Sequence, residues 1–213
     1  MDEPLIPEYL MDYLDDLVPP RLPEMQAMER HAEMIDFPII GPASGYLCYQ
    51  VARMIKAKRV FELGSGFGYS TAWFARAVAE NGGGEVVHVV WDEDLSQQAR
   101  THLAALGYDG IVRFVVGEAV QTLRGTEGPF DLIFSDINKE DYPASLPAIA
   151  EKLRPGGVLI VDNMLWHGRI FNSRDKTPAT EGIRQLSSQL TRSQQWISIL
   201  VPVRDGVMVA YKV

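Results

Sequence analysis

The feature that most constrains this chain is a short apolar run that changes into a glycine-rich turn, Val60-Phe61-Glu62-Leu63-Gly64-Ser65-Gly66-Phe67-Gly68-Tyr69-Ser70. The residues that follow it, 70–80, have the pattern of a helix. A strand that leads through glycines into a helix places backbone N–H groups and a helix N-terminus against a ligand. Glycine permits positive φ and removes the Cβ that would block close approach. The stretch therefore predicts a ligand-binding turn, and a tight turn that binds nothing is the alternative.

The spacing of the glycines separates two classes of ligand. A dinucleotide fingerprint requires G-x-G-x-x-G, and counting from Gly64 its last position is Tyr69. An NAD-dependent oxidoreductase therefore fits the stretch poorly. The pattern present is Glu-x-Gly-x-Gly-x-Gly, with Glu62 two residues before the first glycine. This pattern resembles the first motif of class I S-adenosylmethionine (SAM) methyltransferases.

Strand and helix patterns alternate through most of the chain. Apolar runs predict strands at 59–63, 85–91, 112–116, 130–135 and 158–162, with helices at 70–80, 95–106, 119–123 and 143–153 between them. A helix is also expected at 180–190, and Asp205-Gly206 between the runs 196–203 and 206–212 predicts a closing hairpin. This order predicts an α/β fold with a Rossmann-like, doubly wound and mostly parallel seven-stranded sheet that ends in an antiparallel hairpin. No linker or repeat interrupts it, so residues 1–213 are expected to form a single domain.

Residues 1–40 are expected to be a helical extension that precedes the sheet. Helices are predicted at 4–18 and 23–35, and Pro19-Pro20 and Asp36-Phe37-Pro38 end them. Ser44 is a plausible N-cap of a further helix that runs to residue 55. The extension could be a lid, a dimer contact or simple packing, and the sequence does not choose among these roles.

Composition and charge exclude several classes of function. The formal net charge of −8 argues against nucleic acid as a partner, because phosphate binding requires an excess of Lys and Arg. Cys48 is the single cysteine, so neither a disulfide within the chain nor a cysteine zinc site is possible. The first residues, Met1-Asp2-Glu3-Pro4, do not resemble a signal peptide, and no apolar run reaches the length of a membrane span. We therefore expect a cytoplasmic protein without a membrane partner.

Polar side chains follow two of the predicted strands. Asp136 comes after the fourth strand, and Asp162 and Asn163 come after the fifth. Ligands of an open parallel sheet bind beyond the carboxyl ends of its strands. Two carboxylates and an amide oxygen are hard donors that suit Mg²⁺ or Ca²⁺. A lone aspartate at such a place more often caps the next helix or a turn, but the Asp-Asn pair and the nearby Lys139 favour a metal site.

These motifs together resemble one family. Asp136-x-x-Lys139 after one strand, Asp162-Asn163-x-x-Trp166-x-Gly168 after the next, and the glycine motif are similar to the metal-dependent O-methyltransferases, which include catechol and caffeoyl-CoA O-methyltransferases. The resemblance runs from about Gly41 to the C-terminus and is weakest before residue 36. It implies transfer of a methyl group from SAM to a hydroxyl of a catechol-like or other small aromatic acceptor. It also implies that a divalent cation assists the reaction, with Mg²⁺ expected ahead of the alternatives Ca²⁺ and Mn²⁺. The family resemblance further implies a homodimer.

The resemblance also implies roles for individual residues. Asp136, Asp162 and Asn163 fall on the family's metal ligands, and Lys139 falls on the general base that acts on the substrate hydroxyl. Trp166 lies in the substrate-side loop. Nine positions match the cofactor site, Ile40, Glu62, Gly64, Gly66, Tyr69, Ser70, Ala119, Asp136 and Ile137, and Asp92 is a tenth candidate cofactor residue. The alternative for Lys139 is a surface lysine that pairs with Glu140 or Asp141.

One position departs from the family's pattern. Members end the second strand with an acid that binds the ribose hydroxyls of the cofactor, and here that position is Val90. An unpaired ligand hydroxyl costs about 1–3 kcal/mol. Either Asp92 binds the ribose or cofactor affinity is reduced, and Asp92 fits equally well as part of the acidic first turn of the next helix. Two alternatives thus stay open: a non-catalytic dimer with weakened or lost SAM binding, and a metal-free methyltransferase.

Overall fold

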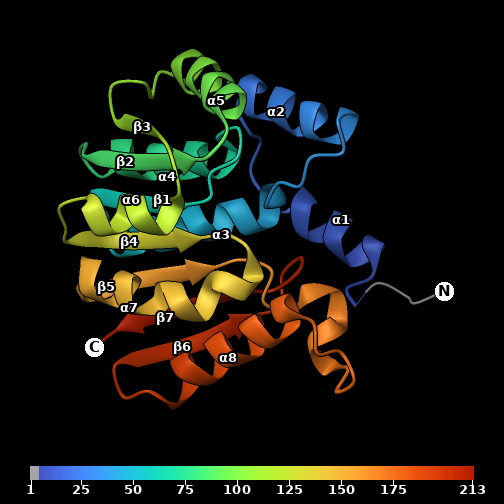
Figure 1. Cartoon of the computed structure of the whole chain (residues 1–213). Coiled ribbons are helices and arrows are strands. Elements are labelled where there is room, and N and C mark those ends of the chain that lie inside the picture. Colours follow the sequence, from blue (N-terminus) through green and yellow to red (C-terminus); the bar gives the residue numbers. More distant parts are fainter. Residues whose placement is uncertain (1–4) are drawn as a thin grey trace.

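Seven strands form a sheet in the order β3-β2-β1-β4-β5-β7-β6 (Figure 1). The structure is a computed structural model that describes residues 5–213. Its strands are β1 (Arg59–Leu63), β2 (Glu85–Val90), β3 (Val112–Val116), β4 (Phe130–Ser135), β5 (Leu153–Val161), β6 (Trp196–Val201) and β7 (Val207–Lys212). Its α-helices are α1 (Glu8–Asp16), α2 (Pro23–Met34), α3 (Gly41–Met54), α4 (Tyr69–Glu80), α5 (Glu93–Ala105), α6 (Ala119–Gly125), α7 (Tyr142–Lys152) and α8 (Pro178–Arg192). Two short 3₁₀ helices, η1 (Lys139–Asp141) and η2 (Trp166–Phe171), follow β4 and β5.

The strand order confirms the predicted fold class. Strands β1 to β5 pair in parallel, while β7 runs antiparallel to both β5 and β6. The chain first builds outward from β1 through β2 to β3 and then returns to place β4 on the other side of β1. Ligands of open α/β sheets bind at this change of direction, beyond the carboxyl ends of the strands. In Figure 1 the arrowheads of β4 and β5 point to the side on which α1 lies.

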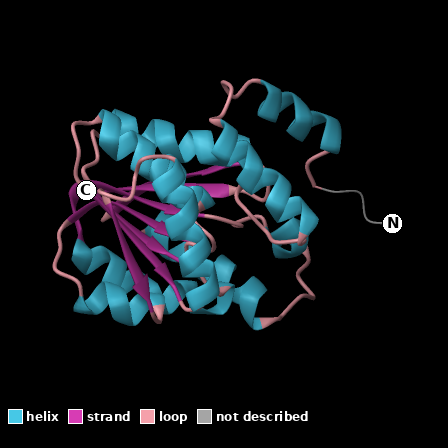
Figure 2. Cartoon of the chain, turned by 90° about the horizontal axis from the view of Figure 1, so that it is seen from above, coloured by secondary structure: helices cyan, strands magenta, loops and turns pink. Residues whose placement is uncertain are grey.

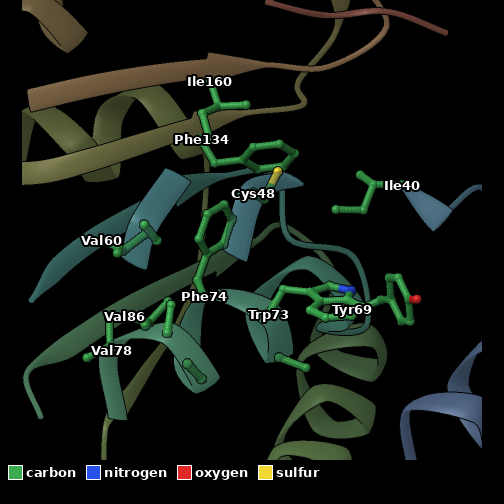
Figure 3. Close-up of a cluster of buried hydrophobic side chains, with 14 of the residues drawn as sticks. Ile40, Cys48, Val60, Tyr69, Trp73, Phe74, Val78, Val86, Phe134 and Ile160 are labelled. Atoms are coloured by element: carbon green, nitrogen blue, oxygen red, sulfur yellow. The ribbon is translucent and has the colours of Figure 1, made fainter. Parts of the chain in front are cut away.

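Helices cover both faces of the sheet, so the central strands β1, β2 and β4 are buried along nearly their whole length and are mostly apolar. Figure 2 shows the sheet between two helical layers. Val60, Val86 and Phe134 belong to the cluster formed with α3, α4 and α5, whereas Phe61 belongs to the cluster formed with α6, α7 and α8. Figure 3 shows Phe74 of α4 among the strand side chains of the first cluster. Each such buried side chain contributes about 1.5–3 kcal/mol to the free energy of unfolding.

Two elements begin at least three residues before their predicted starts. Helix α3 begins at Gly41 with Ile40 at the N-cap position, so the prediction of Ser44 as N-cap is wrong, and Ser44 is buried within the helix. Pro42 in the first turn explains this, because proline fits the start of a helix, where its missing N–H costs nothing. Strand β5 begins at Leu153, five residues before its predicted start, because Leu153 pairs with Phe130 of β4 ahead of a register shift.

The N-terminal helices lie at the carboxyl-end side of the sheet. In Figure 2 the helix that follows the N-terminal trace stands out from the body. No residue of α1 is buried, and Asp15 anchors it by accepting a hydrogen bond of 2.9 Å from the backbone N–H of Ala43 in α3. None of the helices within residues 5–213 is long and apolar enough to cross a membrane. The role of the N-terminal helices as a lid or a dimer contact stays a prediction.

Candidate active site

A cavity of about 1150 Å³ opens at the carboxyl ends of the parallel strands. Its wall is built by the glycine turn, by the segments that follow β2, β4 and β5, by the start of α6, and by the segment that leads into α3. It brings together nearly all the predicted site residues: Ile40, Gly64, Gly66, Tyr69, Ser70, Asp92, Ala119, Asp136, Ile137, Lys139, Asp162, Asn163 and Trp166. Of the predicted cofactor residues, Glu62 is not in this lining. Residues from six separate segments therefore meet at the site where the fold predicts a ligand.

The glycine turn has the geometry that its sequence predicts. Gly64 and Gly68 have φ values of 86° and 94°, in the left-handed region that favours glycine. A Cβ on Gly64 would overlap the backbone carbonyl of Asp136, and one on Gly68 would lie 2.8 Å from Leu103 Cδ2. The glycines thus allow the turn to pack directly against the segment that follows β4 and against α5.

Glu62 lies in the core beside the turn. Its side chain is fully buried and accepts a hydrogen bond of 2.5 Å from Thr71, whose Oγ1 lies 3.0 Å from His88 Nδ1. Burial raises the pKa of Glu62 to about 7, although the hydrogen bond from Thr71 opposes the rise. Burial also lowers the pKa of His88 to about 3, so this histidine is neutral at physiological pH. Glu62 thus belongs to a buried polar cluster under the cofactor turn.

The two aspartates of the predicted metal site follow neighbouring strands. The backbone N–H of Asp136 donates to Leu63 of β1 at 2.8 Å, and that of Asp162 donates to Ser135 of β4 at 3.1 Å. Asp162 is only 1% exposed, and its Oδ1 has no hydrogen-bond partner within residues 5–213. Burial and the charge of Asp136 raise the pKa of Asp162. A buried carboxylate oxygen without a donor fits a cation ligand, because leaving it unpaired is costly.

The third candidate ligand, Asn163, completes the oxygen set. In the described part of the chain no three His, Cys, Asp or Glu side chains gather as a metal-binding group, so a cation here would depend on the amide of Asn163 as well as on the two aspartates. The backbone of Asn163 has a φ of 56°, and its Nδ2 donates to Asp205 Oδ2 at 3.3 Å. The carboxylates of Asp136 and Asp162 and the amide oxygen of Asn163 would not fill all positions of a six-coordinate cation, so positions would stay open for water and an acceptor.

Lys139 lies beside these ligands and not on the outer surface. Its Nζ donates to Asp136 Oδ1 at 2.6 Å and to the carbonyl of Ile137 at 3.2 Å, and its side chain is 11% exposed. The ammonium also lies over the rings of Tyr142 and Trp166, at 5.3 and 5.9 Å from their centroids. The alternative of a surface lysine paired with Glu140 or Asp141 is therefore wrong.

The structure places Val90 at the end of β2, where other family members are expected to carry the acid that binds the ribose. Val90 is the last residue of β2, pairs with Val116 of β3, and lies in the cavity wall at 5% exposure. Asp92 is the N-cap of α5, and its Oδ1 accepts from the backbone N–H of Leu95 at 2.9 Å. Asp92 also lines the cavity, so its capping role is shown and its ribose role stays a prediction.

Two residues of the C-terminal hairpin escaped the sequence analysis. Arg204 lines the cavity, and its Nη1 lies 3.5 Å from Asp162 Oδ2. Asp205 is 6% exposed and bonds to the segment that follows β5. In the sequence, Asp205-Gly206 indicates only a hairpin turn. The turn reaches the cavity because β7 pairs beside β5, and no local signal in the sequence predicts that pairing.

Comparison with known proteins supports the same interpretation. The family model described as O-methyltransferase matches residues 19–213. The chain is 33% identical over 168 residues to a catechol O-methyltransferase of Mycobacterium tuberculosis, covering 78% of this chain and 75% of that protein. It is 29% identical over 155 residues to a catechol O-methyltransferase of Niastella koreensis, covering 71% and 69%.

A solved structure extends the comparison to the fold. The O-methyltransferase TomG from Streptomyces achromogenes, determined in complex with SAM, superposes with a TM-score of 0.84 at 26% identity over 96% of both chains. The match to the O-methyltransferase family model confirms the predicted resemblance and the predicted enzyme class. It contradicts the alternative of an NAD-dependent oxidoreductase. The chain belongs to the O-methyltransferase family.

Proposed function

We propose that this chain transfers the methyl group of SAM to a hydroxyl of a catechol-like or other small aromatic acceptor, with a divalent cation held by Asp136, Asp162 and Asn163. One observation carries the cation: Asp162 is buried, lies in the same cavity as the glycine turn, and has an oxygen with no hydrogen-bond partner among residues 5–213. Catechol O-methyltransferases among the relatives and a SAM-bound structural neighbour support the donor and the acceptor class.

The cofactor would lie in the part of the cavity that is lined by the glycine turn, Ile40, Ala119 and Ile137. The glycine turn offers backbone N–H groups and the start of α4, while Ile40, Ala119 and Ile137 offer apolar surface for the adenine and methionine portions. Val90 stands at the ribose position, and Asp92, the nearest acid along the sequence, caps α5 and also lines the cavity. When bound, SAM supplies an electrophilic methyl group, and the cation supplies positive charge that favours an ionised acceptor hydroxyl.

The residues of this chain orient the acceptor and remove its proton. Trp166 provides an aromatic surface beside Lys139, which suits a small aromatic ring. Lys139 Nζ would act as general base: it would first release one proton to solvent and then accept the hydroxyl proton. Its present partner is Asp136, which would also hold the cation, so the two positive charges compete for one carboxylate. Catalysis by such a site depends on positioning and electrostatics and needs no covalent intermediate with the protein.

The test is methyl transfer from SAM to a panel of catechols, before and after complete removal of metal with EDTA. We expect activity to disappear with the metal and to return with Mg²⁺, and Ca²⁺ and Mn²⁺ serve as comparison ions. Activity that survives metal removal would support the metal-free alternative. Monohydroxy aromatic compounds serve as controls, because they offer one oxygen where a catechol offers two.

A non-catalytic protein with lost cofactor affinity is the second candidate, and Val90 favours it. Calorimetric titration with SAM discriminates between the two. Binding in the micromolar range supports the enzyme, whereas no binding at millimolar SAM supports the non-catalytic alternative.

We also propose a homodimer, as the family resemblance implies. The outer strand β6 exposes Ile197 and Ile199, and Tyr211 of β7 pairs beside Ile197. An exposed apolar patch at a sheet edge is typical of an interaction surface. Analytical ultracentrifugation tests the proposal, and a mass of one chain at micromolar concentration would contradict it.

A further inference from the structure

The hairpin turn between β6 and β7 binds the segment that follows β5 along several residues. The backbone N–H of Met164 donates to the carbonyl of Gly206 at 2.9 Å, and that of Leu165 donates to the carbonyl of Asp205 at 2.8 Å. The side chain of Asp205 adds two further bonds. Its Oδ1 accepts from the backbone N–H of His167 at 2.6 Å, and its Oδ2 accepts from Asn163 Nδ2 at 3.3 Å.

The segment held by Asp205 has an unusual backbone. Asn163, Trp166 and His167 have φ values of 56°, 50° and 50°, in the left-handed region of the backbone that residues other than glycine rarely adopt. Such conformations persist only where the surroundings enforce them, and they concentrate at functional sites. Asp205 is buried and spans this segment from its first residue to its fifth, so it is the side chain placed to enforce it.

We propose that Asp205 is a positioning residue for the cation site, because it fixes the orientation of the Asn163 amide. The two ends of an amide differ, and a carboxylate can only accept hydrogen bonds. Asp205 therefore selects the NH₂ end of Asn163 and leaves the oxygen end for the cavity that Asn163 lines. Asp205 itself does not line that cavity, so it acts through Asn163 and not as a ligand. The proposal rests on the cation of the proposed function.

Asp205→Asn tests the proposal because it keeps the shape and removes one acceptor. Oδ1 of the new amide still accepts from His167, so its NH₂ end faces Asn163. Two NH₂ groups cannot bond to each other, so the Asn163 amide must turn and present its own NH₂ group to the cavity. Groups that orient a metal ligand typically account for about 10–100-fold in metal affinity. We expect D205N to weaken Mn²⁺ binding by that factor in titrations of the metal-stripped full chain followed by electron paramagnetic resonance.

The reciprocal exchange N163D/D205N separates positioning from general stability. In this double variant the carboxylate at position 163 can accept from the amide at position 205 with one oxygen and offer the other to the cation, so Mn²⁺ affinity should return. Because a third carboxylate also adds charge, N163D is measured in both backgrounds. We expect N163D to raise Mn²⁺ affinity at least tenfold more in the D205N background than in the wild type. An equal effect in both backgrounds would overturn the proposal.

Two controls complete the experiment. Asp131 accepts from the backbone N–H groups of Lys58 and Arg59 at the opposite end of the sheet, so D131N should lower stability and leave Mn²⁺ affinity within twofold. If D205N does not fold, D205S replaces it, because serine is too short to reach Asn163. Mn²⁺ affinity of either variant within twofold of the wild type would overturn the inference alone. No Mn²⁺ binding by the wild type would overturn the proposed cation site and this inference with it.

Discussion

Lys139 Nζ donates a hydrogen bond of 2.6 Å to Asp136 Oδ1, so the candidate base and a candidate cation ligand are joined directly. Both residues follow β4, and Lys139 opens the short helix η1 three residues after Asp136. The lysine side chain is 11% exposed and the aspartate side chain 30% exposed, so water reaches the pair mainly on the aspartate side. Proton transfer and cation binding are therefore coupled through one carboxylate, and a change at either residue should affect both.

Lys139→Met should lower kcat by about 10²–10⁴-fold while the KM for a catechol changes much less. Methionine keeps an unbranched side chain that is one atom shorter, but it has no amine and cannot accept a proton. Steady-state kinetics with saturating SAM and Mg²⁺ provide the measurement. Lys58→Met is the matched control, because Lys58 is exposed just before β1, at the opposite end of the sheet. An unchanged kcat in Lys139→Met would exclude the general-base role.

Val90→Glu should raise the affinity for S-adenosylhomocysteine about tenfold, measured by calorimetry. The change restores an acceptor for the ribose hydroxyls at the end of β2, and satisfying such groups is worth about 1–3 kcal/mol. Val116→Glu is the matched control, because Val116 pairs with Val90 in the next strand but does not line the cavity. Equal affinities for Val90→Glu and wild type would show that the ribose is bound elsewhere.

Asp92→Asn should leave cofactor affinity within twofold. Strand β2 keeps a regular pairing with β3 up to Val90, so no register shift brings Asp92 into the place of the missing acid. Asn caps a helix as well as Asp does, so the capping bond to Leu95 and the stability should persist. A loss of tenfold or more in the same calorimetric titration would instead assign the ribose to Asp92.

The sequence predicts the central strands well because β1, β2 and β4 are buried along nearly their whole length, which makes them mostly apolar. It predicts Asp136, Asp162 and Asn163 as neighbours for a related reason. The carboxyl ends of parallel strands share one edge of the sheet, so residues far apart in the chain can be placed together without knowledge of side-chain contacts. The cavity at that edge contains all three.

The two misplaced elements have different causes. The start of β5 at Leu153 is set by its pairing with Phe130, which is not local information, whereas the early start of α3 follows from Pro42, a local signal for the start of a helix. Asp205 looks like an ordinary turn residue in the sequence. Its contact with Asn163 arises only because β7 lies beside β5. Local patterns therefore identify the candidate ligands, whereas the residue that orients one of them depends on tertiary structure.

Asp162→Asn should abolish cation binding and at the same time stabilise the metal-free protein. Asp162 is buried, and burial together with the charge of Asp136 raises its pKa, so ionising it in the folded chain is costly. An amide removes that cost and leaves a single oxygen ligand. Thermal unfolding in EDTA at pH 8 should give a higher Tm, while Mn²⁺ titration and methyl transfer should show loss. A lower Tm would mean that the carboxylate serves the fold.

Glu62→Gln should stabilise the protein at neutral and higher pH but not in acid. The pKa of Glu62 rises from 4.5 to about 7 because the side chain is buried. Below pH 4.5 the carboxyl is protonated in both the folded and the unfolded chain and contributes no difference. Between pH 4.5 and 7 the unfolded chain releases the proton while the folded chain keeps it, so stability falls as pH rises. The total loss is about 3 kcal/mol.

Urea unfolding of wild type and Glu62→Gln in EDTA at several pH values measures this difference. The free energy of unfolding of the variant should exceed that of the wild type increasingly from pH 4.5 to 7 and by a constant amount above. Glu80→Gln is a control of opposite sign: although burial opposes it, hydrogen bonds from Tyr49 and Arg76 lower the pKa of Glu80. Its carboxylate stabilises the fold above its unfolded pKa, so the variant should lose stability there. A difference for Glu62→Gln that does not change with pH would mean that Glu62 ionises as readily in the folded chain as in the unfolded one.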